Sequence, residues 1–375
     1  MHEVKSGAPA PSLPYMPQLD GLRAVAVLAV LASHWIPQAN RFGHVGLAGV
    51  YVFFVLSGFL ITSILLGARD AKDAGDATLG GELRTFFARR VLRIFPAYYL
   101  AVIGSYLAWP NRFGNDLSWN LAYLGNMRAF AIGKTTSINH FWSLAVEEQF
   151  YLFWPFVVLL VPRRQLQSVI AIGIAMSPAW RLFTLSVDWR HIVYSYPAWS
   201  NFDSLGLGAL LAVQGRENAT WTRAAGAVGA LLWMACGIAT YVVLGSFRLS
   251  RPGDVWGAIF VVYPLAVSLT GVWIVARAAE TRADVLGNVL AWRPLRWVGM
   301  ISYGVYVYHF FVQGLVDITT LHFSDHELPT APRLVVLLVA TLAVSAASYF
   351  VLERPARALG RRLGGGTRAI ERTAR

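Results

Sequence analysis

The chain has 375 residues, of which 56% are hydrophobic and only 14% are charged. A composition this apolar excludes an ordinary water-soluble enzyme and predicts a protein that crosses the plasma (inner) membrane several times. The 32 Lys and Arg residues outnumber the 20 Asp and Glu residues, which gives a formal net charge of +12. In a membrane protein this excess is typical of cytoplasmic loops rather than of nucleic-acid binding. The single cysteine, Cys236, excludes a disulfide framework and a cysteine-based metal cluster.

Ten apolar segments have lengths that suit, or nearly suit, a helix across a bilayer. In chain order they are residues 20–36, 46–67, 92–109, 142–161, 166–185, 199–213, 224–244, 255–276, 298–317 and 333–352. The sequence therefore predicts an all-α integral membrane protein, a bundle of about ten transmembrane helices. The first 17 residues lack the apolar core of a signal peptide, so we expect the first apolar segment to remain in the membrane.

The distribution of positive charge predicts the orientation of these segments. If the N-terminus lies inside, most Lys and Arg residues fall on inner loops, as the positive-inside tendency requires. Both termini are then cytoplasmic. We expect a cytoplasmic N-terminal segment over residues 1–18, a transmembrane domain over 19–355 and a basic cytoplasmic tail over 356–375.

The first apolar segment carries ionisable groups at both ends, Arg23 and His34. The two residues are three helical turns apart, so they share almost one face at depths that differ by about 16 Å. Ionisable groups within a membrane helix are candidates for function. His34 could act as a general base, or it could simply face interfacial water at the end of the helix.

Two adjacent carboxylates, Glu147 and Glu148, follow the start of the fourth segment. Carboxylates at this depth need partners or water. Neighbouring side chains on a helix point about 100° apart, so we expect one to face a site and the other a structural partner. Either could orient the imidazole of His34, as the third group of a catalytic triad does, and periodicity does not choose between them.

Arg89 and Arg93 begin the third segment at an i, i+4 spacing and so share a helix face. Together with free backbone N–H groups they could bind an anion such as a phosphorylated ligand. Alternatively, they are a topogenic cluster whose side chains extend to anionic lipid.

Further polar residues lie in the later segments. Ser302, Tyr306 and His309 form one polar stripe, which could bind a substrate or form hydrogen bonds between helices. Asp203 is either an acceptor-binding carboxylate or a group that begins the sixth segment. Residues 353–355, Glu-Arg-Pro, predict a Glu–Arg contact and the end of a helix.

The outer loop over residues 322–327 contains two histidines and two acidic residues. It lacks the helical spacing of metal-binding histidines, so we predict no metal site there or elsewhere.

Six segments of the chain together resemble the acyltransferase-3 family of integral membrane O-acyltransferases. They are residues 19–24 with His34, 49–61 (GVYVFFVLSGFLI), 89–99 (RRVLRIFPAYY), 140–155 (HFWSLAVEEQFYLFWP), 301–309 and 345–355. The resemblance implies about ten transmembrane helices, an acyl-CoA donor and a hydroxyl acceptor on a carbohydrate or glycosylated molecule. It also implies that Arg23 and His34 are functional and that Arg89 and Arg93 contact CoA at the cytoplasmic face.

The chain differs from the family pattern in two respects. Family members often have arginine two residues before the aspartate that Asp203 matches, whereas this chain has Asn201. The SGNH-type domain that is fused to many relatives is missing from the sequence, so we expect any second acylation step to need another protein.

These features predict that neutral His34 takes the proton of an acceptor hydroxyl as the oxygen attacks the thioester of acyl-CoA, with acetyl as the expected group. A covalent acyl-histidine intermediate is the alternative route. Arg89 and Arg93 would bind the donor, and Arg23 could hold the donor or balance the charge of Asp20. Glu147 or Glu148 would support His34. Acyl-CoA is a co-substrate here, and no permanently bound cofactor is expected. A transporter or flippase for a sugar-containing substrate is the competing class, because buried charges also suit a transport path.

Overall fold

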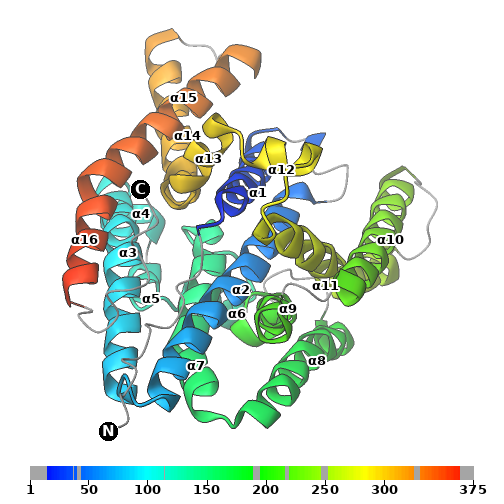
Figure 1. Cartoon of the computed structure of the whole chain (residues 1–375). Coiled ribbons are helices and arrows are strands. Elements are labelled where there is room, and N and C mark those ends of the chain that lie inside the picture. Colours follow the sequence, from blue (N-terminus) through cyan, green and yellow to red (C-terminus); the bar gives the residue numbers. More distant parts are fainter. Residues whose placement is uncertain are drawn as a thin grey trace, which may run out of the picture.

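The computed structural model describes residues 15–36, 38–39, 44–113, 115–188, 195–215, 219–245, 252–324 and 330–363. Within these ranges every regular element is a helix (Figure 1). The predicted terminal segments are described in part, because residues 1–14 and 364–375 lie outside these ranges.

The helices vary from single turns to spans of 30 residues. In chain order they are α1 (Pro17–Trp35), α2 (Val45–Asp73), α3 (Leu79–Ala108), α4 (Pro110–Phe113), α5 (Asp116–Leu121), α6 (Gly125–Ile132), α7 (Trp142–Leu160), α8 (Arg163–Asp188), α9 (Phe202–Gln214), α10 (Ala219–Gly245), α11 (Pro252–Ala279), α12 (Val285–Leu290), α13 (Arg293–Met300), α14 (Ser302–Ser324), α15 (Thr330–Ser348) and α16 (Arg354–Leu363).

Each of the ten expected segments overlaps at least one of these helices. Within the described part of the chain, seven helical stretches are long and apolar enough to cross a membrane: Val45–Asp73, Leu79–Ala108, Asn139–Leu160, Arg163–Ser186, Thr220–Ala239, Ile259–Ala279 and Ala331–Leu363. The chain is thus an all-helical, multi-pass membrane protein. The other three expected segments correspond to α1, which carries Asp20, Arg23 and His34, to the 13-residue α9 and to α14.

Close glycine contacts join α2 to α9 near the centre of the bundle. A Cβ atom added to Gly58 would lie 1.9 Å from the carbonyl oxygen of Leu205, and one added to Gly208 would lie 2.1 Å from that of Val55. The two backbones therefore touch directly, as small residues allow between membrane helices. This contact places the short α9 firmly against one face of α2.

The ends of α2 and α7 are joined by cations. Arg69 donates two hydrogen bonds of 2.7 Å to the carbonyl oxygens of Val158 and Val161, and Lys72 donates one of 3.0 Å to that of Leu159. The last carbonyls of a helix have no partner within it, and cations there also suit the helix dipole. These bonds complete the C-terminal end of α7.

The same kind of close approach joins α1 to α12 and α13. A Cβ atom on Gly21 would lie 1.9 Å from the carbonyl oxygen of Leu290, and one on Gly299 would lie 1.7 Å from that of Asp20. Only glycine permits backbones to lie this close. The two short helices therefore pack tightly against the first two turns of α1, at the end of which Arg23 lies.

The predicted helix end near Pro355 is wrong. Residues Tyr349–Glu353 form a π-helical turn, and the chain then continues as α16, with Pro355 in its first turn, where a missing N–H costs nothing. The buried Glu353 accepts a 2.8 Å hydrogen bond from Arg357, rather than from Arg354 as expected. The helix α16 packs along α3, where Gly360 lies against Arg89.

Candidate active site

A cavity of about 240 Å³ lies between α1, α2, α3, α7 and α14. Its walls combine apolar side chains with an unusual number of charged and hydroxyl groups. The polar lining residues are Arg23, Ser57, Arg90, Arg93, Ser143, Glu147, Glu148, Tyr151, Ser302, Tyr303 and Tyr306. Segments far apart in the sequence therefore meet at one polar chamber inside an apolar bundle, which is the usual setting of a binding site.

The two glutamates of α7 both border this cavity, although we expected only one to do so. Glu147 accepts hydrogen bonds from Ser57 at 2.8 Å and from the hydroxyl of Tyr151 at 3.0 Å. Glu148 has no hydrogen bond or ion pair with any described residue. Glu147 is thus engaged in the wall, whereas the carboxylate of Glu148 is free to act in the cavity.

Two arginines of α3 bring positive charge to the same chamber. The guanidinium of Arg90 lies over the ring of Tyr151, 5.3 Å from its centroid, and near that of Phe86. Arg93 has no carboxylate within 4 Å among the residues that the structure describes. Half-buried cations without a paired anion are costly, so the arrangement suits an anionic ligand.

The sequence assigned Arg89 to this site beside Arg93, but the structure places Arg90 and Arg93 on the cavity and Arg89 against α16. Residues at i, i+3 share a helix face as well as residues at i, i+4, so both pairs fit the periodicity. The packing of α16 on α3 decides which face is covered.

Arg23 also borders the cavity, as its position on α1 suggested. Its side chain donates to Asp20 at 3.0 Å, and Asp20 accepts a second hydrogen bond of 2.8 Å from the hydroxyl of Tyr15. The guanidinium is therefore fixed at one end of the chamber, but its charge is partly balanced.

His34 lies on the same helix but does not border the cavity, and its side chain is exposed. Its Nδ1 is 2.9 Å from Nε2 of His309, and the two rings are nearly parallel. The described partner of His34 is thus His309, and neither Glu147 nor Glu148 contacts it. A third histidine, His140, has its ring centroid 5.0 Å from that of His309. The sequence could have indicated His140 as a site residue, because it begins the 140–155 segment.

The hydrogen bonds of His309 determine the tautomer of His34. Nδ1 of the buried His309 lies 2.7 Å from the carbonyl oxygen of Tyr306, which can only accept, so this nitrogen carries a hydrogen. In the neutral ring Nε2 of His309 is then an acceptor, and Nδ1 of His34 must donate to it. This leaves a lone pair on Nε2 of His34, which is the arrangement that a general base needs.

Tyr306 connects the histidines with the cavity. Its hydroxyl donates to the carbonyl oxygen of His140 at 2.7 Å and lies 2.5 Å from the hydroxyl of Ser143, which also borders the cavity. Ser302, one turn earlier on α14, lines the chamber as well. Of the predicted polar stripe, two residues therefore face the cavity and His309 faces His34.

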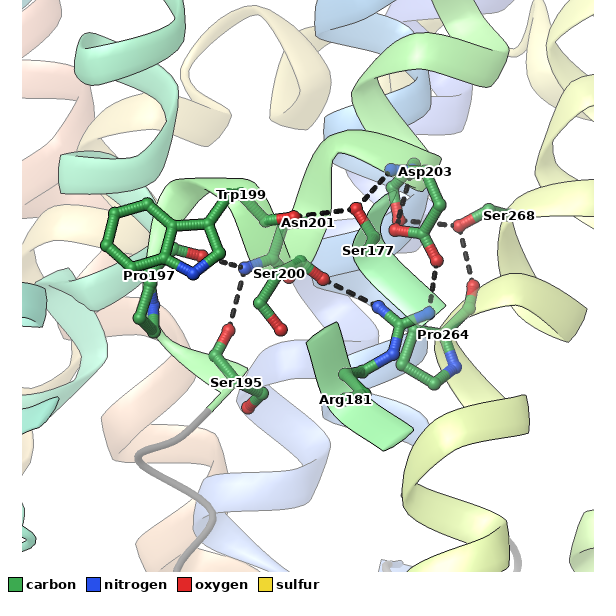
Figure 2. Close-up of polar contacts among 11 residues, drawn as sticks. Ser177, Arg181, Ser195, Pro197, Trp199, Ser200, Asn201, Asp203, Pro264 and Ser268 are labelled. Carbon is green, nitrogen blue, oxygen red and sulfur yellow. Dashed lines mark hydrogen bonds and ion pairs between the residues drawn. The ribbon is translucent and has the colours of Figure 1, made fainter. Parts of the chain in front are cut away.

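Asp203 lies outside the cavity in a buried polar cluster (Figure 2). Its carboxylate is 2.5 Å from the guanidinium of Arg181 on α8, and both side chains have 0% exposure. It also accepts a 2.9 Å hydrogen bond from the backbone of Ser204. Asn201 instead donates to the carbonyl oxygens of Ser195 and Pro197. Arg181 was not among the residues predicted for the site, although it is a charged residue within an otherwise apolar segment.

The structure arranges no group of three His, Cys, Asp or Glu side chains for a metal ion in the part of the chain it describes. The candidate loop over residues 322–327 falls partly outside that part.

The chain is similar in sequence to bacterial proteins that are named as O-acetyltransferases. The peptidoglycan O-acetyltransferase OatA of Listeria monocytogenes is 29% identical over 381 residues, which cover 92% of this chain and 56% of the relative. The Bacillus subtilis protein named "Putative peptidoglycan O-acetyltransferase YrhL" is 30% identical over 373 residues, covering 92% and 55%. This chain thus spans little more than half the length of these two relatives. No solved structure matches it.

The sequence profile described as "Acyltransferase domain" matches residues 16–350, which include the whole cavity and both histidines of the His34–His309 pair. That match covers most of the chain. The chain therefore belongs to this acyltransferase family.

Proposed function

We propose that this protein is a membrane O-acetyltransferase that moves an acetyl group from acetyl-CoA to a sugar hydroxyl of peptidoglycan. The observation that carries the proposal is a cavity whose Arg90 and Arg93 have no paired carboxylate among the described residues, in the same bundle as a histidine, His34, whose Nε2 is left as an acceptor. The names of the relatives support acetyl as the group and peptidoglycan as the acceptor. We further propose ten transmembrane segments with both termini in the cytoplasm.

Arg90 and Arg93 are proposed to bind the negatively charged part of the donor, with Arg23 as a third cation. Pockets that enclose a whole drug-sized ligand usually have volumes of about 300–1,000 Å³. The volume of about 240 Å³ therefore suits the acyl end and thiol arm of acetyl-CoA, while the nucleotide stays at the mouth. The pair Arg89 and Arg93 remains the prediction from sequence, and the geometry favours Arg90 in place of Arg89.

His34 is proposed to act first as a base and then as an acid. Nε2 of His34 takes the proton of the acceptor hydroxyl while the hydroxyl oxygen forms a bond to the thioester carbon. The bond between that carbon and the sulfur then breaks, and the CoA thiolate recovers the proton from the imidazolium. His309 would orient the imidazole throughout, in the manner of the third group of a triad.

The glutamates take different roles in this proposal. Glu147 holds Ser57 and Tyr151 in the cavity wall. Glu148, which has no contacting cation among the described residues, would balance the charge of Arg90 and Arg93 when the donor is absent. Ser302 and Tyr306 would contact the acyl end or the acceptor, because both border the chamber.

The test uses the full chain in proteoliposomes with acetyl-CoA that carries a labelled acetyl group and with soluble peptidoglycan fragments. We expect label in the fragments, and a rate for His34→Ala that is lower by a factor of about 100 to 10,000, the usual contribution of a general base. His44→Asn is the matched control, because His44 begins α2 with a positive φ that asparagine tolerates and lies away from the cavity.

Wild-type transfer by His34→Ala would overturn the assignment of the base. Label that never enters any sugar acceptor, while the sugar itself crosses the vesicle membrane, would instead support a transporter.

A further inference from the structure

The two short helices between α11 and α14 expose an apolar surface. The exposed apolar side chains of α12 include Val285, Leu286 and Val289. Trp292, which directly precedes α13, and Trp297, within α13, are exposed as well. Val285 is 83% exposed and Trp292 is 62% exposed. No described side chain covers them, although water-exposed tryptophan is costly.

The same segment carries positive charge beside this surface. Arg293 is exposed and has no carboxylate within 4 Å among the described residues. By contrast, the preceding cations are engaged: Arg277 pairs with Asp284, and Arg282 lies 2.7 Å from Glu280. The apolar surface is therefore bordered by a cation that has no paired carboxylate in the described part of the chain.

The neighbouring helices define the surroundings of this surface. The segment directly follows a stretch that is long and apolar enough to cross a membrane, Ile259–Ala279, and it leads into α14. Figure 1 shows α12 and α13 beside α1, and the glycine contacts at Gly21 and Gly299 fix them there. Since their inner faces pack on α1, their apolar outer side chains lie at the periphery of a membrane-embedded bundle.

We propose that α12 and α13 form an interfacial element that lies in the headgroup region of an anionic leaflet. The valines and leucine enter the boundary of the acyl chains, the two tryptophans lie at headgroup level, and Arg293 binds lipid phosphate. Anionic phospholipid is the partner because a lone exposed cation beside tryptophan matches its charge and its depth.

This element is connected to the cavity by a chain of polar contacts. Arg296 of α13 donates to the hydroxyl of Tyr15 at 3.1 Å, and Tyr15 donates to Asp20 at 2.8 Å. Asp20 in turn accepts from Arg23, which borders the cavity. Tyr15 and Asp20 therefore link α13 to Arg23.

Spin labels on the full chain test the proposal without any measurement of acyl transfer, so failure here leaves the proposed function intact. In a Cys236→Ala background, single cysteines replace Val289, Trp292 and, as a control, Asp76, which lies exposed in the turn between α2 and α3. The labelled proteins are placed in vesicles of phosphatidylcholine, with or without phosphatidylglycerol. Collisions of each label with oxygen and with a water-soluble nickel chelate report its depth.

We expect the label at 289 to favour oxygen strongly, the label at 292 to favour it less because it lies at headgroup level, and the label at 76 to favour the chelate. Phosphatidylglycerol should increase the ratio of oxygen to chelate collisions at 292, and Arg293→Gln should remove that increase. Labels at 289 and 292 that meet the chelate as often as the label at 76 would overturn the interfacial placement. A ratio that is indifferent to phosphatidylglycerol would overturn the choice of anionic lipid.

Discussion

Nδ1 of His34 and Nε2 of His309 lie 2.9 Å apart, although 275 residues separate them in the chain. Because His309 is buried and bound to a backbone carbonyl, it imposes one tautomer on an exposed histidine that would otherwise exchange freely between two. The pair therefore resembles a base and its orienting group, with an imidazole in place of the usual carboxylate.

We expect His309→Ala to lower the rate of acetyl transfer nearly as much as His34→Ala, because His34 then loses the acceptor that fixes its tautomer. His309→Gln keeps an acceptor oxygen near Nδ1 of His34 and should lose less. The double variant His34→Ala/His309→Ala should be no slower than His34→Ala alone, since residues that act as a unit are not additive. Equal rates for His309→Ala and the wild type would remove His309 from the mechanism.

Arg90→Gln and Arg93→Gln should each raise the KM for acetyl-CoA by about tenfold to 100-fold, because a hydrogen bond to a charged group is worth roughly 1.5–3 kcal/mol. Arg89→Gln should change it far less, since Arg89 packs beside α16. Arg84→Gln, an exposed position on the same helix, is the control. If Arg89→Gln had the largest effect, the assignment from sequence would hold and the one from geometry would fail.

Substitution by glutamine should have different effects at Glu147 and at Glu148. Glu147→Gln weakens the bonds to Ser57 and Tyr151, which should lower the free energy of unfolding by roughly 1–3 kcal/mol. The protein should therefore unfold at a lower temperature in detergent. Glu148→Gln removes a charge that has no bonded partner among the described residues, so it should alter acetyl transfer without lowering the unfolding temperature. The opposite pattern would exchange their roles.

Removal of one partner of the Arg181–Asp203 ion pair should destabilise the protein severely. Arg181→Met leaves a carboxylate with 0% exposure unpaired, which typically costs about 3–5 kcal/mol. Adding Asp203→Asn removes the stranded charge but keeps an acceptor for the backbone of Ser204. Thermal unfolding in detergent should show the double variant to be more stable than Arg181→Met. A double variant that is less stable would mean that the two side chains act independently.

The sequence allowed the helical class and most helix positions to be predicted, because the apolar segments are long and separated by charged loops. The 3.6-residue period predicted that Arg23 and His34 share almost one face of α1, whereas only Arg23 borders the cavity. Periodicity describes one helix at a time, however. It could not choose Arg90 over Arg89, because that choice depends on where α16 packs on α3.

Contacts between distant segments account for the other differences. The expected carboxylate partner of His34 was chosen by analogy with triads, whereas the fold brings His309 to it from α14. Asp203 has its cation on the preceding helix, 22 residues earlier, and a single arginine in an apolar segment gives no indication of its partner. Pro355 was read as a helix end, but a proline in a first turn is compatible with a helix that begins there.

Gly58 of α2 lies against the backbone of Leu205 on α9, and Gly208 of α9 lies against that of Val55 on α2, beside the cavity. Helices that touch through glycine have no side chains between their backbones, so α2 and α9 are held close together. Ser57, next to Gly58, therefore belongs to a closely packed wall of the chamber. We expect the chamber to widen at another wall, such as α3, which carries Arg90 and Arg93, rather than at α2.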